Sequence, residues 1–112
     1  MPALFNPEPL DRFHSQPAVV RRLIDLYLEI TPECIEKIQA SIGDNDAEQV
    51  AFHAHSLKGS SSELGAEQMA DLGLQLQMAG RNEDWALIRD LAGRLQACMA
   101  ETRSALNALD IS

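Results

Sequence analysis

Residues 46–65 read DAEQVAFHAHSLKGSSSELG, and the apolar positions within them recur every three or four residues, as on one face of a helix. The turn that precedes this stretch, residues 43–46, offers polar cap candidates that end at Asp46. Gly65 is placed to end the helix, because glycine adopts the left-handed conformation at little cost. The pattern therefore predicts a helix over residues 46–63.

One face of this helix has the composition of a protein core. At about 100° per residue, six side chains fall within roughly 60° of one another. They are Ala47, Val50, Ala54, Leu57, Ser61 and Leu64. His53 falls at the edge of this face, whereas His55 lies about 140° from its centre. We therefore expect the imidazole of His55 to point to solvent.

The outer face around His55 has an unusual composition. The residues that share it are Glu48, Ala51, Phe52, Gly59 and Ser62. Phe52 is a large apolar residue directed outward, and Gly59 costs about 1 kcal/mol relative to alanine inside a helix. Lys58 follows His55 by three residues and so lies alongside it. The pattern indicates a flat, partly apolar docking surface around one exposed imidazole.

Two further helices are predicted before this stretch. Asn6-Pro7-Glu8 resembles a helix start and predicts a short helix to about His14. A helical stripe then runs through Val19, Leu23, Leu26 and Ile30, and it resumes with Ile35, Ile38 and Ile42. Pro32 interrupts this stripe and lacks a backbone N–H, so residues 17–42 form either one kinked helix or two abutting helices.

Two more helices are predicted after the stretch. One covers residues 66–80, and a single fourth helix follows the cap candidates of residues 82–84. The apolar stripe of that helix consists of Trp85, Ile88, Leu91, Leu95, Cys98, Thr102, Ala105 and Leu109. Short turns between long helices favour antiparallel neighbours. We predict an all-α protein with a single domain over residues 1–112: an N-terminal segment with a short helix (1–16) and an antiparallel up-down four-helix bundle (17–110).

Composition narrows the classes of function. The chain has 112 residues and a net charge of −8, which argues against binding to nucleic acid or to an anionic membrane surface. No apolar stretch approaches the ~20 residues of a membrane span, and the N-terminus lacks the basic and apolar regions of a secretory signal. Cys34 and Cys98 lie on apolar helix faces and are expected to be buried free thiols. These features predict a cytoplasmic protein, and we expect it to be a monomer.

A metal site is not expected at the histidines. His53 and His55 are two apart on a helix and point about 200° from each other, so they cannot chelate one ion even with help from His14. No cysteine or acidic ligand set accompanies them. We therefore expect the chain to bind no metal and no cofactor of its own.

The run from Ala54 to Ser61, followed by Leu64-Gly65-Ala66, closely resembles the signature of histidine-containing phosphotransfer (HPt) domains, the four-helix-bundle intermediates of multistep phosphorelays. On this resemblance, His55 is the phosphoacceptor and Lys58 neutralises the phosphoryl group. Gly59 leaves room for a docking receiver domain.

Two residues of the next helix also match family members. Gln77 stands where several members have a glutamine that hydrogen-bonds the active imidazole and so orients it, and Arg81 matches a basic residue found one turn further on in some members. Neither residue is universal in the family.

The resemblance implies a stand-alone phosphocarrier that shuttles a phosphoryl group between the aspartates of receiver domains in a hybrid sensor kinase and a response regulator. The receiver would supply Mg²⁺ and the catalytic acids. The chain shows no Gly-rich ATP-binding loop, so we do not expect an enzyme that phosphorylates itself. The alternative is a non-catalytic helical module that regulates a receiver or kinase by docking, or a structural bundle in which His55 is incidental.

Overall fold

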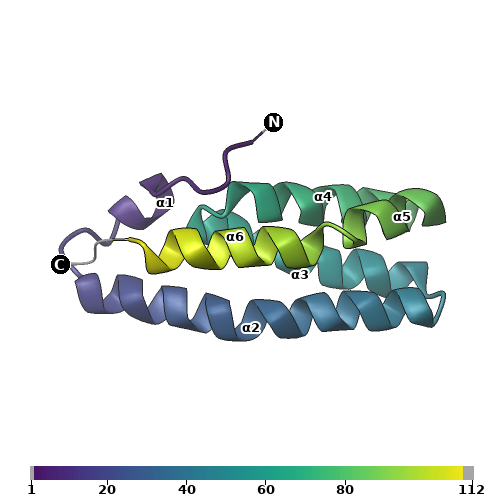
Figure 1. The fold of residues 1–112 in the computed structure, drawn as a ribbon, viewed down its shortest axis with the longest axis horizontal. Helices are drawn as coiled ribbons and strands as arrows, with labels where there is room; N and C mark the ends of the chain where they lie inside the picture. The colour runs from purple at the N-terminus through teal and green to yellow at the C-terminus, as the bar shows by residue number, and fades with distance from the viewer. Residues whose placement is uncertain (1, 110–112) are drawn as a thin grey trace.

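The computed structural model describes residues 2–109, and all regular structure in that range is helical. The helices are α1 (Glu8–Asp11), α2 (Pro17–Gly43), α3 (Ala47–Leu64), α4 (Glu67–Arg81), α5 (Trp85–Ala92) and α6 (Leu95–Asn107). Along the chain, α2, α3, α4 and the α5–α6 pair alternate in direction (Figure 1). The predicted all-α, antiparallel four-helix bundle with a short N-terminal helix is confirmed.

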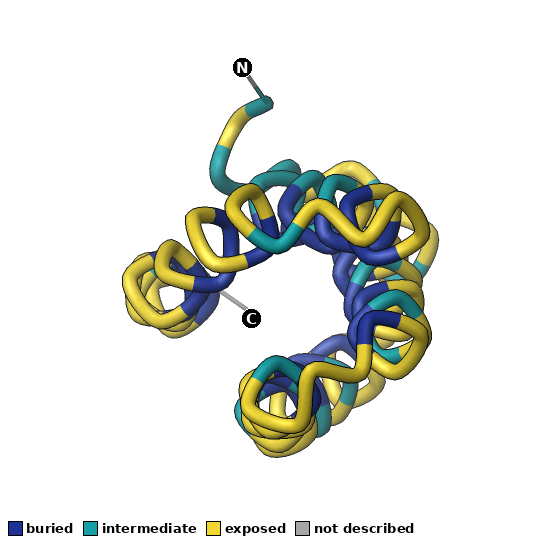
Figure 2. Tube along the Cα trace, turned by 90° about the vertical axis from the view of Figure 1, so that its right-hand side faces the viewer, coloured by how far each residue is buried: buried dark blue, intermediate teal, exposed yellow. Residues whose placement is uncertain are grey.

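The core lies between the helices, with buried residues on their inner faces and exposed residues on the outside (Figure 2). Helix α3 is the clearest example, because its buried residues are the six that its periodicity predicts. They are Ala47, Val50, Ala54, Leu57, Ser61 and Leu64. The rotation of α3, and with it the outward direction of residue 55, therefore follows from the sequence alone.

Helix α3 begins and ends as its terminal residues predict. The Asp46 carboxylate accepts a hydrogen bond from the backbone N–H of Gln49 at 3.1 Å, which satisfies one unpaired donor of the first turn. Gly65 ends the helix with φ of +91°, and the N–H of Ala66 donates to the carbonyl of Ser61 at 2.9 Å. These two ends set the length of the helix that carries His55.

The N-terminal segment lies against the turn between α3 and α4. The N–H of Asn6 donates to the carbonyl of Gly65 at 2.7 Å, and its side-chain amide donates to Glu67 at 3.1 Å. The Asn6 side chain also accepts from the N–H of Glu8 at 3.1 Å, next to Pro7. Helix α1 ends at Asp11 rather than near His14, because the chain turns there to enter α2.

Helix α2 passes through Pro32 as one continuous helix, so the alternative of two abutting helices is wrong. Because proline has no N–H, the carbonyl of Leu28, four residues earlier, loses its helical partner. The guanidinium of Arg103 on α6 donates to this carbonyl at 3.4 Å. A neighbouring helix thus partly compensates for the missing backbone hydrogen bond.

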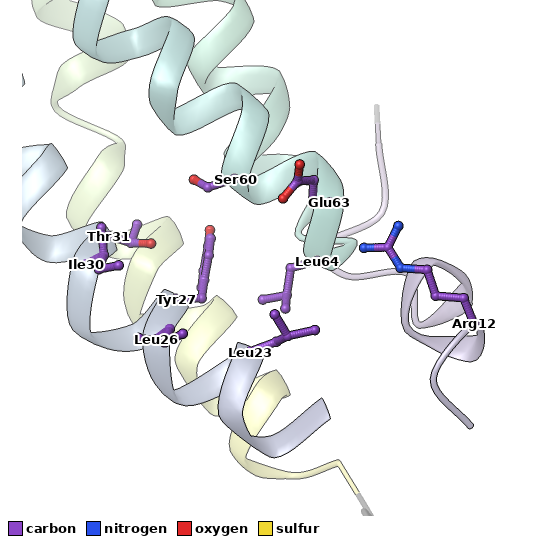
Figure 3. A pocket seen from close by; sticks show the side chains of 9 residues that line it. All are labelled: Arg12, Leu23, Leu26, Tyr27, Ile30, Thr31, Ser60, Glu63 and Leu64. Atoms are coloured by element: carbon purple, nitrogen blue, oxygen red, sulfur yellow. The ribbon is translucent and has the colours of Figure 1, made fainter. Parts of the chain in front are cut away.

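The first half of α2 is rotated relative to the stripe that the sequence indicates. The residues buried in the core are Val20, Ile24, Tyr27 and Thr31, each one position after a member of the predicted stripe. The predicted stripe, Val19, Leu23, Leu26 and Ile30, is half-buried or exposed. Figure 3 shows three of its members, together with Leu64 of α3, around an apolar hollow of about 160 Å³. The prediction failed because both neighbouring stripes are apolar, and only packing against α3 selects between them.

The predicted fourth helix is in fact two helices, α5 and α6, separated at Gly93 and Arg94. At the break the N–H of Arg94 donates to the carbonyl of Leu91 at 3.0 Å, three residues back instead of four. Glycine has a low helix propensity, which favours an interruption at this point. The apolar stripe still continues across the break, since Ile88, Leu91 and Leu95 are all buried.

Both cysteines are free thiols; Cys98 is buried as predicted, whereas Cys34 is only half-buried. The thiol of Cys34 donates to the carbonyl of His53 at 3.3 Å, and burial raises the pKa of both cysteines. A raised pKa lowers the fraction of reactive thiolate at a given pH. Across residues 2–109, no helix combines the length and apolar character needed to cross a membrane.

Candidate functional site

His55 is exposed on the outer face of α3, as its position in the sequence predicts. It lines a shallow hollow of about 290 Å³ between α3 and α4. The side chains that line the hollow come from two turns of α3 and the last turns of α4. They are Glu48, Gln49, Ala51, Phe52, His55, Gln77 and Arg81. Six of these seven residues are candidates named from the sequence.

Gln77 is the most buried polar residue of this hollow, with 7% of its surface exposed. It lies on the face of α4 that packs against α3, next to the buried Leu76. Among the hydrogen bonds of the described residues, none joins its side chain to His55. Gln77 and His55 therefore line the same hollow from two different helices.

Lys58 and Ser62 line a neighbouring hollow rather than the one at His55. This second hollow, of about 340 Å³, is bounded by Pro2 and Pro9 of the N-terminal segment. Lys58 is half-buried, and in the described part of the chain no carboxylate lies within ion-pair distance of its ammonium group. A cation in this setting is screened less by water than a fully exposed one.

Gly59 is the open position of the surface. A β-carbon added to it would meet no atom within 4 Å, apart from the helix's own nearby backbone. Among residues 2–109, none occupies the space above Gly59, so another molecule can approach the backbone of α3 closely there.

The surface around His55 is partly apolar, as expected from the sequence. Phe52 is 63% exposed, and its ring contacts that of His53 edge-on, with centroids 5.2 Å apart. Gln49 was not among the sequence-based candidates, because its helical phase lies well away from that of His55. Exposed large apolar residues at one site are typical of a protein-binding surface.

A comparison with protein families matches residues 22–105 to the Hpt domain. The chain belongs to the Hpt domain family. The match covers α3, which carries His55, and both helices that line the hollow. The sequence-based prediction of a histidine phosphotransfer protein of phosphorelays is thereby confirmed for this Hpt chain at the level of the family.

Among solved structures, the Hpt chain is similar to the crystal structure of histidine-containing phosphotransfer protein B (HptB) from Pseudomonas aeruginosa PAO1. The TM-score is 0.87 at 21% sequence identity, and the match covers 93% of this chain and 91% of that one. At this identity the similarity concerns the fold. The comparison with curated proteins finds no match.

The chemistry available at the site comes from side chains alone. Within residues 2–109, no three His, Cys, Asp or Glu side chains gather as a metal ion would require. The site offers the exposed imidazole of His55 as a nucleophile and the buried amide of Gln77 in the same hollow. Lys58 supplies a positive charge one helical turn after His55, and Phe52 supplies exposed apolar surface.

Proposed function

We propose that this Hpt chain is a phosphocarrier in which His55 accepts a phosphoryl group from the aspartate of one receiver domain and passes it to the aspartate of a second. The observation that carries the proposal is the exposure of His55 in the hollow that it shares with Gln77. An exposed ring can be reached by the active site of another protein, whereas a buried ring cannot.

The transfer step follows from the chemistry of imidazole. The lone pair of one ring nitrogen attacks phosphorus, and an N–P bond forms as the bond between phosphorus and the aspartate oxygen breaks. The receiver aspartate leaves with the electron pair as a carboxylate. The other ring nitrogen keeps its proton, which the side-chain carbonyl of Gln77 can accept as a hydrogen bond that fixes the tautomer.

The charge of the phosphoryl group requires compensation on both sides of the interface. On this chain, Lys58 lies one helical turn after His55 and can offset the added negative charge. Arg81 lines the hollow from α4 and can contribute in the same way. We propose, from the family resemblance, that the receiver supplies Mg²⁺ and the catalytic acids and that no cofactor is bound here.

The docking surface in this proposal comprises Glu48, Ala51, Phe52, Gly59 and Ser62. Phe52 supplies apolar area, and Gly59 supplies the open position above the α3 backbone. The partners we propose are the receiver domains of a hybrid sensor kinase and a response regulator, each binding to the same face in turn. Monomeric state and cytoplasmic location remain predictions from the sequence.

The proposal is tested by incubating the chain with a radiolabelled phosphoreceiver. We expect acid-labile label on the wild type and none on His55→Gln. His14→Gln is the matched control, because His14 is also exposed but lies in the turn after α1.

Equal labelling of the wild type and His55→Gln would reject the assignment of the phosphoacceptor. Receiver binding without any label on the wild type would instead favour the alternative of a non-catalytic docking module.

A further inference from the structure

We infer that Gly73 and Gly80 of α4 are positioning residues for phosphotransfer, because they bring α4 close enough to α3 for Gln77 to reach His55. Gly73 precedes Gln77 by one helical turn, and Gly80 follows it by nearly one turn. All three are buried on the same side of α4. This inference rests on the proposed phosphotransfer at His55.

The contacts of Gly80 set the separation of the helices on one side of Gln77. A β-carbon on Gly80 would lie 3.0 Å from the carbonyl oxygen of Ala47, 3.0 Å from the amide nitrogen of Ala51 and 3.1 Å from the Ala51 β-carbon. These distances are shorter than ordinary van der Waals contact, and two of the three atoms are backbone. The helix backbone cannot rotate away as a flexible side chain would, so α4 itself must shift.

Gly73 makes the equivalent contact on the other side of Gln77. Its β-carbon would lie 2.8 Å from the amide nitrogen of Lys58 and 3.0 Å from the carbonyl oxygen of Ala54. On α3, the two contact points Ala51 and Lys58 lie on either side of His55, four residues before it and three after it. The two glycines therefore hold α3 and α4 close together on both sides of the segment that carries Gln77.

The position of the Gln77 side chain depends on the spacing of α3 and α4. Gln77 is almost fully buried, and it lines the hollow where His55 lies. A hydrogen bond weakens steeply once its atoms are pulled apart or misaligned, so a displacement of a few tenths of an ångström matters for the ring contact. A small misplacement of a group that orients a reactant slows the reaction far more than it destabilises the fold.

The test uses Gly80→Ala and Gly73→Ala, with Gly43→Ala as the matched control. Gly43 ends α2, and a β-carbon there would meet no atom within 4 Å. We expect each of the first two variants to slow transfer from a saturating phosphoreceiver about tenfold. Gly43→Ala should transfer at the wild-type rate.

The role of Gln77 is separated from a general packing effect by a double-mutant cycle. If Gly80 acts through Gln77, adding Gly80→Ala to Gln77→Ala should cause no further loss of rate. Nitrogen-15 NMR of the His55 ring should show the same change of tautomer population in Gly80→Ala and Gln77→Ala. If an alanine variant fails to fold, Gln77→Asn serves in its place. This change shortens the reach of the amide without adding bulk, and it should cause the same loss of transfer rate.

Multiplicative rate losses in the cycle, or an unchanged tautomer population in the slow variants, would overturn the inference. A wild-type chain that accepts no label at His55 would instead refute the proposed function, so the two failures are distinguishable.

Discussion

Single side chains on one helix set the chemistry of this protein. His55 is exposed and Leu57, two residues later, is fully buried, because positions two apart on a helix point in nearly opposite directions. Lys58 stays on the outer side of α3 and is only half-buried. The imidazole of His55, the ammonium group of Lys58 and the core side chain of Leu57 thus all lie within residues 55–58.

Lys58→Ala should slow phosphotransfer about tenfold, which corresponds to the loss of about 1.4 kcal/mol of stabilisation as charge develops on the phosphoryl group. The measurement is the single-turnover rate with a phosphoreceiver. Lys37→Ala is the control, because Lys37 is exposed on α2. A loss of helix by circular dichroism in Lys58→Ala would show that the lysine stabilises the fold instead.

Tyr27 on α2 forms a buried hydrogen bond of 2.7 Å with the hydroxyl of Ser61 on α3. Burial raises the pKa of Tyr27 to about 12 from its ordinary value of 10.0. Its neutral form is therefore favoured in the folded state. The preference for the neutral form contributes about 2–3 kcal/mol to the free energy of unfolding. The contribution is fully present below pH 10 and is lost as the pH rises towards 12.

We therefore expect the free energy of unfolding of the wild type to fall more steeply between pH 10 and 12 than that of Tyr27→Phe. The chain contains one tyrosine, so its ultraviolet absorbance reports the ionisation of Tyr27 directly. At pH 7, Tyr27→Phe should be less stable by about 1 kcal/mol, because Ser61 loses its partner. Parallel pH curves for the two proteins would contradict this account.

At the scale of elements, the two turns at one end of the bundle have the same hydrogen-bond pattern. Asn45 and Glu83 each have φ of 53°, in the left-handed region. The N–H groups of Asn45 and Glu83 each donate to the carbonyl three residues earlier in the chain. The N–H groups of the residues that follow them, Asp46 and Asp84, each donate to the carbonyl five residues earlier. The aspartate then caps the following helix. Asparagine tolerates this conformation better than glutamate does.

Glu83→Asn should raise the free energy of unfolding by about 0.5–1 kcal/mol, because it relieves backbone strain without touching the core. The reverse change, Asn45→Glu, should lower it by a similar amount. Chemical denaturation of both variants and the wild type measures these differences. Equal stability of all three proteins would show that the strain at this position is negligible.

At the scale of the whole molecule, stability depends on the core that joins α3 to its neighbours. Leu57 is 0% exposed at the centre of this core. Leu57→Ala should lower the free energy of unfolding by about 2–5 kcal/mol through lost burial and a residual cavity.

Leu87→Ala is the control, since Leu87 is 40% exposed on α5 and should cost much less. Thermal unfolding of both variants measures the difference. A Leu57→Ala protein that melts like the wild type would contradict the position of this residue in the core.

The sequence by itself determined the parts of the protein that depend on one helix at a time. The limits of α3 follow from the Asp46 cap and from Gly65, and the rotation of α3 follows from a single unambiguous apolar face. These features set the exposure of His55 and the open position at Gly59, because they arise from local backbone chemistry and helical periodicity. The family resemblance rests instead on the residues of the run from Ala54 to Ser61.

Only the tertiary structure decided the features that depend on how two helices meet. The first half of α2 has two adjacent apolar stripes, and its contact with α3 selects the one that contains Ile24 and Tyr27. That Gln77 and His55 line one hollow depends on the spacing and register of α3 and α4, which have close backbone contacts at Gly73 and Gly80. Periodicity along one chain segment carries no information about the distance to another segment, so packing alone could supply these results.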